Sequence, residues 1–452
     1  MNYDEIVDEI INIPRFSSGV NKSGKDNLLK VMEQLGNPHK AIKSIHIAGT
    51  NGKGSTARFV MDILAAKGYS VGIFTSPHLV RINERIGIAT LQDDRKNILV
   101  KDISDEDFVC CYNLVKEAVD IVQSNGGLHL SFFEFIFAMA TVYFFKKGPD
   151  YVIYETGLGG RLDATNILEP EITAITSIGL DHTDYLGDTI EKVAAEKAGI
   201  IKHKIPVVYC TGDEAADKVI LDRATELGCK EINVAKTDYI IYEITNKTID
   251  FSMVNRYYRY HHLKLFVGGA TYQVNNAITA IVLCNTLFSE VGCIDQDIIQ
   301  LALDNFYWPG RMEAIHPNVI LDGAHNLDAI NRFTECVVDG YGDKEVNLLF
   351  AVAGDKDYGP MIDMLCQELS LKSIWVTSIN SKRGISSEYI ADIFRKTIKK
   401  QGKKTEVFYD DSIENAFSQA FELVKETDDI LFCVGSLYLI GSIKEIAQEV
   451  LV

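Results

Sequence analysis

The sequence lacks the cysteine patterns that mark a zinc site or a disulfide-linked domain. Its nine cysteines are scattered over 452 residues, with no Cys-x-x-Cys pair and only Cys110 and Cys111 adjacent. Such usage is typical of a reducing compartment. Residues 1–5 are acidic and belong to no signal-type apolar segment, so we expect a cytoplasmic protein.

Long apolar runs and positive charge are also scarce. The strongest apolar run, residues 132–145, carries Glu134 and is shorter than the roughly 20 residues of a membrane span, so we expect a buried helix. The 45 Lys and Arg against 63 Asp and Glu give a net charge of -18. This balance argues against nucleic acid or an acidic membrane as the main partner, although a local basic site for a phosphorylated small molecule is compatible with it.

The chain is long enough for two or three domains, and 47% of its residues are hydrophobic, which allows a large core. Strand and helix patterns alternate up to residue 235, and residues 238–267 then alternate aromatic or β-branched with polar residues, which predicts a small antiparallel sheet. The strand–helix alternation restarts near Gly292. We therefore predict an α/β protein with a parallel-sheet domain at residues 1–293 and a Rossmann-like, doubly wound domain at residues 294–452.

A glycine-rich turn follows the apolar run at residues 42–47 and precedes an amphipathic run at residues 58–67. The turn consists of Gly49, Thr50, Asn51, Gly52, Lys53, Gly54, Ser55 and Thr56. Strand, glycine turn and helix start form a phosphate-binding arrangement, in which Lys53 neutralises charge and Ser55 or Thr56 holds magnesium. Gly54 separates Lys53 from Ser55, so this is a variant of the usual phosphate loop. The alternative is an ordinary turn; we predict nucleotide binding.

Polar residues follow the next predicted strands. The strand at residues 70–74 leads to Ser76, the strand at 151–154 leads to Glu155, and the strand at 172–178 precedes His182. In open parallel sheets, ligands bind beyond the carboxyl ends of strands. Glu155 alone could be a solvated strand end, but beside a phosphate loop it is a candidate magnesium ligand. His182 is a less usual magnesium ligand.

Lys197 falls within an apolar stripe of helical spacing over residues 190–201. Two interpretations remain open. The lysine extends its ammonium group to water, or it is buried with a lowered pKa and is able to react or carry a modification.

Taken together, seven stretches match one family in order over nearly the whole chain: residues 49–56, 75–79, 157–166, 179–182, 196–200, 309–313 and 322–326. With these stretches the chain resembles the folylpolyglutamate synthases of the Mur ligase superfamily, including the bacterial forms that are also dihydrofolate synthases. The resemblance implies a Mur-ligase-type N-terminal domain and ATP-dependent ligation of L-glutamate to a folate through an acyl phosphate. Dihydropteroate is a further expected acceptor, giving dihydrofolate.

The resemblance also assigns roles. Residues 49–56 with Asn276, Arg311 and Asp322 would bind ATP, and two Mg²⁺ ions are expected. Expected metal ligands are Ser55, Ser76, Glu155, His182 and Lys197, the last as a carbamate. Expected catalytic residues are Lys53, Lys197, His182 and His325. Expected substrate contacts are Ser76, Pro77, His78, Asp163, His325 and Ser436, and residues 17–24 would also line the folate site.

Two residues depart from the family pattern: Thr156 replaces a small apolar residue, and Tyr272 stands where the family often has histidine. We expect a monomer whose partners are small molecules only. Two other functions remain open. One is a different Mur-type amide ligase, and the other is a non-catalytic ATP-binding regulatory module.

Overall fold

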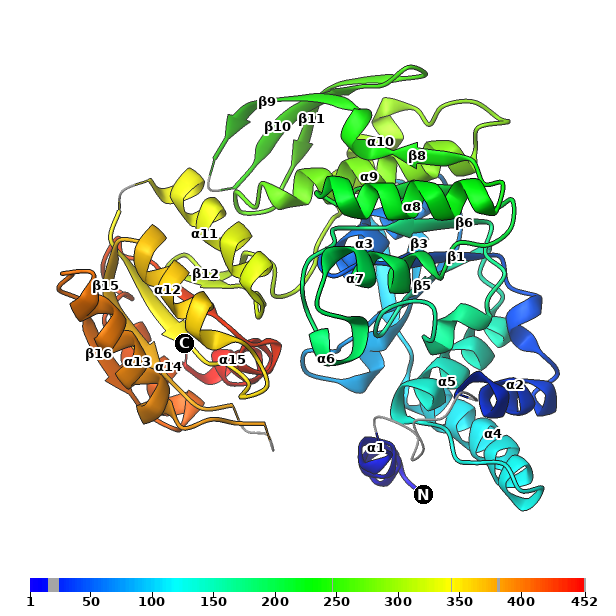
Figure 1. The fold of residues 1–452 in the computed structure, drawn as a ribbon, viewed down its shortest axis with the longest axis horizontal. Coiled ribbons are helices and arrows are strands. Elements are labelled where there is room, and N and C mark those ends of the chain that lie inside the picture. The colour runs from blue at the N-terminus through cyan, green and yellow to red at the C-terminus, as the bar shows by residue number, and fades with distance from the viewer. Residues whose placement is uncertain (15–23, 246, 343, 380–382, 451–452) are drawn as a thin grey trace. The chain divides into compact units, whose positions relative to one another are not determined.

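The structure, a computed structural model, describes the chain apart from residues 15–23, 246, 343, 380–382 and 451–452 (Figure 1). All but the last residue of the predicted folate-lining loop at 17–24 lies outside the described residues. The chain forms two compact units. The first comprises Met1–Tyr239, Met253–His261 and Asn275–Phe306, and the second comprises Ile240–Ser252, His262–Val274 and Tyr307–Val452. The predicted boundary between residues 293 and 294 lies within Asn275–Phe306 and stays a prediction.

The first unit contains a large mixed sheet (Figure 1). Its strands are, in spatial order, β4 (Ile98–Asp102), β3 (Ile86–Leu91), β2 (Val71–Phe74), β5 (Tyr151–Glu155), β1 (Ser44–Ala48), β6 (Ile172–Ile175), β7 (Val207–Tyr209) and β8 (Glu231–Asn233). From β2 to β8 in this order the strands pair in parallel, whereas β3 and β4 add an antiparallel hairpin at one edge. All five residues of β1 are buried, as expected for a central strand covered on both faces.

Helices of this unit surround the sheet. They are α1 (Tyr3–Asn12), α2 (Gly24–Gln34), α3 (Lys53–Ala66), α4 (Asp105–Ser124), α5 (Phe132–Lys147), α6 (Thr183–Leu186), α7 (Ile190–Ala198), α8 (Glu214–Glu226) and α10 (Gln296–Asp304). Short 3-10 turns occur at η1 (Pro38–Lys40), η2 (Ile82–Arg85), η3 (Ala164–Ile167) and η4 (Val234–Lys236). One core cluster joins α1, α2, α4 and α5 to β2 and β5. A second joins α7 and α8 to β1, β6 and β7.

Helix α5 is the apolar run that the sequence analysis expects to be buried. It begins with a capping box, in which the Ser131 and Glu134 side chains each bond the other's backbone N–H group, and it ends at Gly148 with a positive φ of 64°. The cap explains the charged residue in this apolar run, because Glu134 satisfies a backbone donor that the helix leaves open. No helix of the described residues is long and apolar enough to cross a membrane.

A small sheet of three strands follows, in the order β11 (Arg259–Leu265), β10 (Ile249–Val254) and β9 (Asp238–Ile244). It confirms the small antiparallel sheet predicted for residues 238–267. Its residues are divided between the two units. Helix α9 (Tyr272–Leu287) comes next.

The second unit is built on a sheet of six strands. In spatial order these are β12 (Glu313–His316), β13 (Val319–Leu321), β17 (Leu431–Val434), β14 (Val346–Phe350), β15 (Leu371–Val376) and β16 (Glu406–Tyr409). The helices are α11 (Leu327–Tyr341), α12 (Tyr358–Glu368), α13 (Ser387–Lys400), α14 (Ile413–Glu422) and α15 (Leu437–Val450). The strands from β13 to β16 are parallel, which confirms the predicted α/β architecture. The edge strand β12 is antiparallel and was not expected.

A buried aromatic cluster holds α5 against the sheet and supplies a test of this packing. Phe137 is 0% exposed, and its ring centroid lies 5.5 Å from that of Tyr154 and 6.0 Å from that of Phe74. We expect Phe137→Ala to lower the free energy of unfolding by about 3–5 kcal/mol, because it removes a buried ring and leaves a cavity. The measurement is a denaturant titration of the purified protein.

The matched control is Phe145→Ala on the same helix, because Phe145 is 54% exposed and its loss should change stability by no more than about 0.5 kcal/mol. Equal effects of the two substitutions would contradict the assigned packing of α5.

Candidate active site

The predicted phosphate loop and Ser76 follow two parallel strands, and Glu155 is the last residue of the strand between them. β5 lies between β2 and β1, and β1 lies between β5 and β6. In register, Phe74 pairs with Tyr154, Ile47 with Glu155, and Ala48 with Ile175. Because all four strands end at the same edge, the residues that follow them gather there.

The glycine turn is too tightly packed for side chains at two positions. A Cβ on Gly49 would lie 1.8 Å from Thr176 Oγ1, and one on Gly52 would lie 2.5 Å from Asn276 Oδ1. Gly52 also has a φ of +82°, which favours glycine. The turn is bonded to the strand end of β6, since the Thr50 N–H donates to the Ser177 carbonyl at 2.7 Å. The loop is therefore fixed in place, and Asn276 lies beside it.

Lys53, Glu155 and Ser76 lie together at this edge. The Lys53 ammonium donates to the Gly49 and Thr50 carbonyls, each at 3.1 Å, and is 4.0 Å from Glu155 Oε1. Glu155 Oε2 accepts the Ser76 N–H at 3.1 Å. Glu155 is buried, so its carboxylate is held by the cation and the backbone N–H group rather than by bulk water.

Lys197 is buried, which decides between the two alternatives left by the sequence. The residue is 3% exposed, and its ammonium donates to the Gly49 carbonyl at 2.7 Å. Burial, and next the charge of Lys53, lower the pKa of Lys197 to about 7. A substantial fraction of this amine is therefore uncharged near neutral pH.

His182 follows β6 at the same edge and precedes α6. Its backbone is left-handed, with a φ of +52°, and its side chain is exposed. The described residues contain no group of three His, Cys, Asp or Glu side chains that could hold a metal ion by themselves. An ion at this edge would need phosphate oxygens, water or hydroxyl groups in addition, which is how Mg²⁺ is commonly held.

A hydroxyl group on the first turn of α3 fits such an arrangement. Thr56 Oγ1 is buried and has no hydrogen-bond partner within the described ranges. Unpaired buried hydroxyl groups are rare. The neighbouring Ser55 is buried as well.

Asp163 is held by its own loop. Asp163 Oδ2 accepts the Gly157 and Leu158 N–H groups at 2.9 Å each, and Oδ1 accepts the N–H and hydroxyl of Thr165 at 3.0 and 2.5 Å. Thr165 Oγ1 also lies 2.7 Å from Nε2 of His46 on β1. Because the hydroxyl proton goes to Asp163, His46 donates through Nε2, and burial lowers the pKa of His46 to about 3. His46 was not predicted from the sequence, since a strand that is buried on both faces has no alternation to mark a polar residue.

His78 lies after β2, in the segment that follows the cis Ser76–Pro77 bond. Arg85 Nε donates to His78 Nδ1 at 2.9 Å. Burial, and next the charge of Arg85, lower the pKa of His78 to about 4, so this imidazole is neutral at physiological pH.

In the second unit, Asp322 directly follows β13 and is 3% exposed. Its Oδ2 accepts the Met312 N–H at 3.0 Å and the Tyr272 hydroxyl at 3.1 Å, and its Oδ1 accepts the Ala324 N–H at 2.8 Å. Met312 has a φ of +49°, a strained value for a side chain of this size. The carboxylate therefore fixes the backbone beside Arg311, the other predicted ATP contact in this unit.

His325 and Ser436 follow neighbouring strands of that unit. Leu321 on β13 pairs with Cys433 on β17, and the Gly435 N–H donates to the Ala324 carbonyl at 3.0 Å. His325 Nδ1 lies 2.7 Å from the Gly323 carbonyl, which orients the imidazole. Asp322, His325 and Ser436 thus share one edge of the second sheet.

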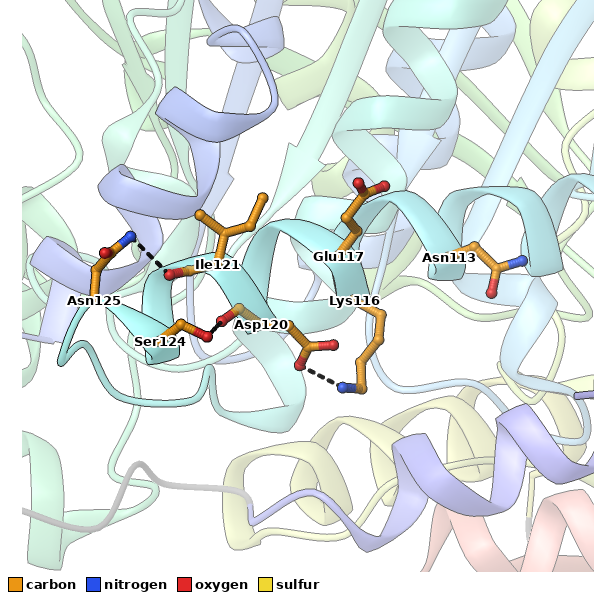
Figure 2. A pocket seen from close by; sticks show the side chains of 7 residues that line it. All are labelled: Asn113, Lys116, Glu117, Asp120, Ile121, Ser124 and Asn125. Carbon is orange, nitrogen blue, oxygen red and sulfur yellow. Dashed lines mark hydrogen bonds and ion pairs between the residues drawn. The ribbon is translucent and has the colours of Figure 1, made fainter.

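An open hollow lies along α4 (Figure 2). Its lining includes the ion pair of Lys116 with Asp120 at 2.5 Å, one helical turn apart. None of the predicted site residues lines it.

Comparison with known proteins gives the class of this molecule. The Mur ligase middle domain matches residues 110–284, and the Mur ligase glutamate ligase domain matches residues 310–437. The two-unit fold, the glycine turn and these matches define a Mur ligase.

Similar proteins of known name identify the family within the Mur ligases. The chain is 34% identical over 437 residues to the dihydrofolate synthase/folylpolyglutamate synthase of Bacillus subtilis, which covers 95% of this chain and 96% of that protein. The chain belongs to the dihydrofolate synthase/folylpolyglutamate synthase family of Mur ligases.

Solved structures agree with this family. The folylpolyglutamate synthase of Mycobacterium tuberculosis complexed with ADP matches with a TM-score of 0.86 and 26% identity, covering 98% of each chain. Escherichia coli FolC in complex with DHPP and ADP matches with a TM-score of 0.83 and 25% identity, covering 99% of this chain and 98% of that chain.

The lowered pKa of Lys197 predicts a pH-dependent stability. Between about pH 7 and its usual pKa of 10.5, the unfolded chain binds a proton at Lys197 that the folded chain does not. The free energy of unfolding should therefore rise with pH in this window, by about 1.4 kcal/mol per pH unit from this group at its steepest. The measurement compares wild type and Lys197→Met by denaturant titration at several pH values, in buffers freed of carbon dioxide.

Lys192→Met is the control, because Lys192 is an exposed lysine paired with Asp188 at 2.7 Å. The rise should persist in that variant and shrink in Lys197→Met. Parallel pH dependences of wild type and Lys197→Met would contradict the lowered pKa of Lys197.

Proposed function

We propose that this protein is an ATP-dependent amide ligase that joins L-glutamate to a folate and also to dihydropteroate. The proposal is supported chiefly by the group at the end of β1, where Lys53, Lys197 and Glu155 surround the turn that begins at Gly49. A simple nucleotide-binding module needs no buried lysine in addition to Lys53 at the phosphate loop. Family membership supplies the substrate class, since the Bacillus subtilis relative is named dihydrofolate synthase/folylpolyglutamate synthase.

ATP would bind with its phosphates on residues 49–56. Backbone N–H groups at the start of α3 point toward a bound anion, and the helix dipole adds positive potential there. Lys53 would offset the charge of the γ-phosphate. Asn276 beside the turn, with Arg311 and Asp322 of the second unit, would contact the rest of the nucleotide. ADP in the Mycobacterium tuberculosis and Escherichia coli structures is consistent with this role.

The residues at the sheet edge fit Mg²⁺. Buried Glu155 supplies carboxylate oxygen, and Ser55 or the unpartnered Thr56 supplies a hydroxyl oxygen. Ser55 and Glu155 would hold one ion, and Ser76, Glu155, His182 and a modified Lys197 would hold the other. Bound Mg²⁺ would offset the negative charge that develops on the phosphate oxygens during transfer.

Lys197 would carry a carbamate. An uncharged amine adds to carbon dioxide, forming an N–C bond and releasing one proton, and the product is an anion in place of a cation. Burial beside Gly49 and the lowered pKa favour the reactive amine. The change of sign would relieve the repulsion between Lys197 and Lys53 and provide a ligand for a cation.

Ligation would proceed in two steps. An oxygen of the acceptor carboxylate attacks the γ-phosphorus of ATP, the bond to the β,γ-bridging oxygen breaks, and ADP leaves. The glutamate amine then attacks the acyl carbon, and the tetrahedral intermediate expels phosphate as the nitrogen loses a proton. Lys53 and the backbone N–H groups of the turn stabilise the charge on the transferred phosphoryl group.

Substrate contacts follow from the same strand ends. Ser76, Pro77, His78 and the loop held by Asp163 would line the folate site in the first unit, while His325 and Ser436 would contact the incoming glutamate. The neutral His78, held by Arg85, would offer its other ring nitrogen to the substrate.

The nine cysteines, all described, are free, and this supports a cytoplasmic enzyme.

The proposal is tested by measuring ADP release with ATP, Mg²⁺ and glutamate, with tetrahydrofolate or dihydropteroate as the acceptor. We expect release that depends on both glutamate and acceptor, with each of the two acceptors. Lys53→Ala should lower kcat/KM by about a hundredfold or more, because it removes a charge that stabilises the transferred phosphoryl group. Lys192→Ala, on the exposed side of α7, should leave the rate unchanged.

Other results would identify the alternatives. Activity with a different carboxylate acceptor and with neither folate would indicate another Mur-type amide ligase. ADP binding without acceptor-dependent release would indicate a regulatory module and would contradict the proposal.

Carbamylation has its own measurement, the ¹³C NMR spectrum of the protein in ¹³C-labelled bicarbonate. We expect one protein-bound carbamate resonance that is present in wild type and Lys192→Met and missing from Lys197→Met. A spectrum of wild type without this resonance, or its persistence in Lys197→Met, would exclude a carbamate at this residue.

A further inference from the structure

Tyr272, the first residue of α9, contacts a predicted ATP-binding residue although no role was assigned to it. Its hydroxyl donates to Asp322 Oδ2 at 3.1 Å, across a sequence separation of 50 residues. Burial, and next the charge of Asp322, raise the pKa of Tyr272 well above its usual value. The phenol therefore stays protonated and remains a donor. Both residues belong to the second unit.

The contacts of Asp322 show what this donor does. Oδ2 takes two donors, Tyr272 and the Met312 N–H, and Oδ1 takes the Ala324 N–H. An ionised carboxylate offers about four acceptor sites, two on each oxygen. In the described part of the chain, three of these are occupied, and the remaining one is on Oδ1. Tyr272 thus determines which oxygen is left for a ligand.

We propose that Tyr272 is a positioning residue for nucleotide binding, which holds Asp322 so that Oδ1 accepts a hydroxyl or amino donor of the nucleoside of ATP. The inference rests on the proposed role of Asp322 in ATP binding.

The same hydrogen bond also acts on the pKa of Asp322, as the smallest of several contributions that oppose the effect of burial. Burial raises the pKa of Asp322, while Arg311, the backbone donors of Ala324 and Met312, and the Tyr272 hydroxyl lower it. The titratable groups that face this carboxyl are Tyr272 from α9, Arg311 from the segment before β12, and Cys336 from α11. Removal of the Tyr272 hydroxyl takes away one of the interactions that lower the pKa of Asp322, so burial raises this pKa further. A protonated Asp322 has lost the charge that attracts the ligand's donor group.

The decisive variant is Tyr272→Phe, because it removes one oxygen and keeps the ring. We expect the KM for ATP to rise about tenfold, with kcat at saturating ATP changed by no more than about twofold. We also expect the acidic fall of kcat/KM for ATP to move to higher pH by about one unit. The titration of ATP itself is common to both proteins and cancels in the comparison.

Tyr260→Phe is the matched control, because Tyr260 also has a buried hydroxyl, which donates to the Ile294 carbonyl at 2.7 Å in the first unit. Tyr260→Phe should lower the free energy of unfolding without shifting the pH dependence of kcat/KM for ATP. Asp322→Asn provides the second check, since the amide does not titrate. In that background, Tyr272→Phe should cause no further movement of the acidic limb.

Three results would overturn the proposal: an unchanged pH profile and KM in Tyr272→Phe, an equal shift in Tyr260→Phe, or a shift that persists in the Asp322→Asn background. The same variants are compared by calorimetric titration with ADP over the same pH range. An inactive wild type would contradict the proposed ligase function, and ADP binding would still decide the role of Tyr272.

Discussion

The carbonyl group of Gly49 is the point on which the first unit's site depends. Two lysines from different elements donate to it, Lys53 from the start of α3 at 3.1 Å and Lys197 from α7 at 2.7 Å. The residue has no room for a side chain, because Thr176, which directly follows β6, fills that space. This backbone oxygen therefore links the turn to α3 and α7 and brings together the two cations that an anionic ligand would meet.

This arrangement resolves an electrostatic problem of the whole chain. With a net charge of -18, the protein's long-range field repels a nucleotide, so attraction must be local. We propose that Lys53 provides this attraction at the turn. Burial, and next the charge of Lys53, lower the pKa of Lys197 beside it. The unfavourable interaction here is electrostatic, between two neighbouring ammonium groups. Of the two lysines at this carbonyl, Lys197 is the one whose lowered pKa favours a modification that reverses its charge.

Much of this site was predictable from the sequence because it depends on short-range patterns. The glycine turn, the polar residues after strands and a lysine in an apolar stripe are all local signals. The β3–β4 hairpin, α4 and β12 were not predicted. The buried His46 was missed because both faces of a central parallel strand are covered, so no alternation marks a polar exception. The Tyr272–Asp322 contact was missed because its partners are 50 residues apart.

Each unit contains a buried carboxylate that accepts hydrogen bonds from backbone N–H groups. Asp163 and Asp322 differ in the number of hydrogen bonds that they accept. Asp163 receives four hydrogen bonds within its own loop, so its acceptor capacity is used to shape that loop. Asp322 receives three among the described residues, and the last acceptor site is on the oxygen away from Tyr272. An unpaired acceptor in a buried carboxylate is unfavourable unless a ligand completes it. We propose that the nucleoside of ATP supplies the missing donor, and that Tyr272, by donating to Oδ2, leaves Oδ1 available for it.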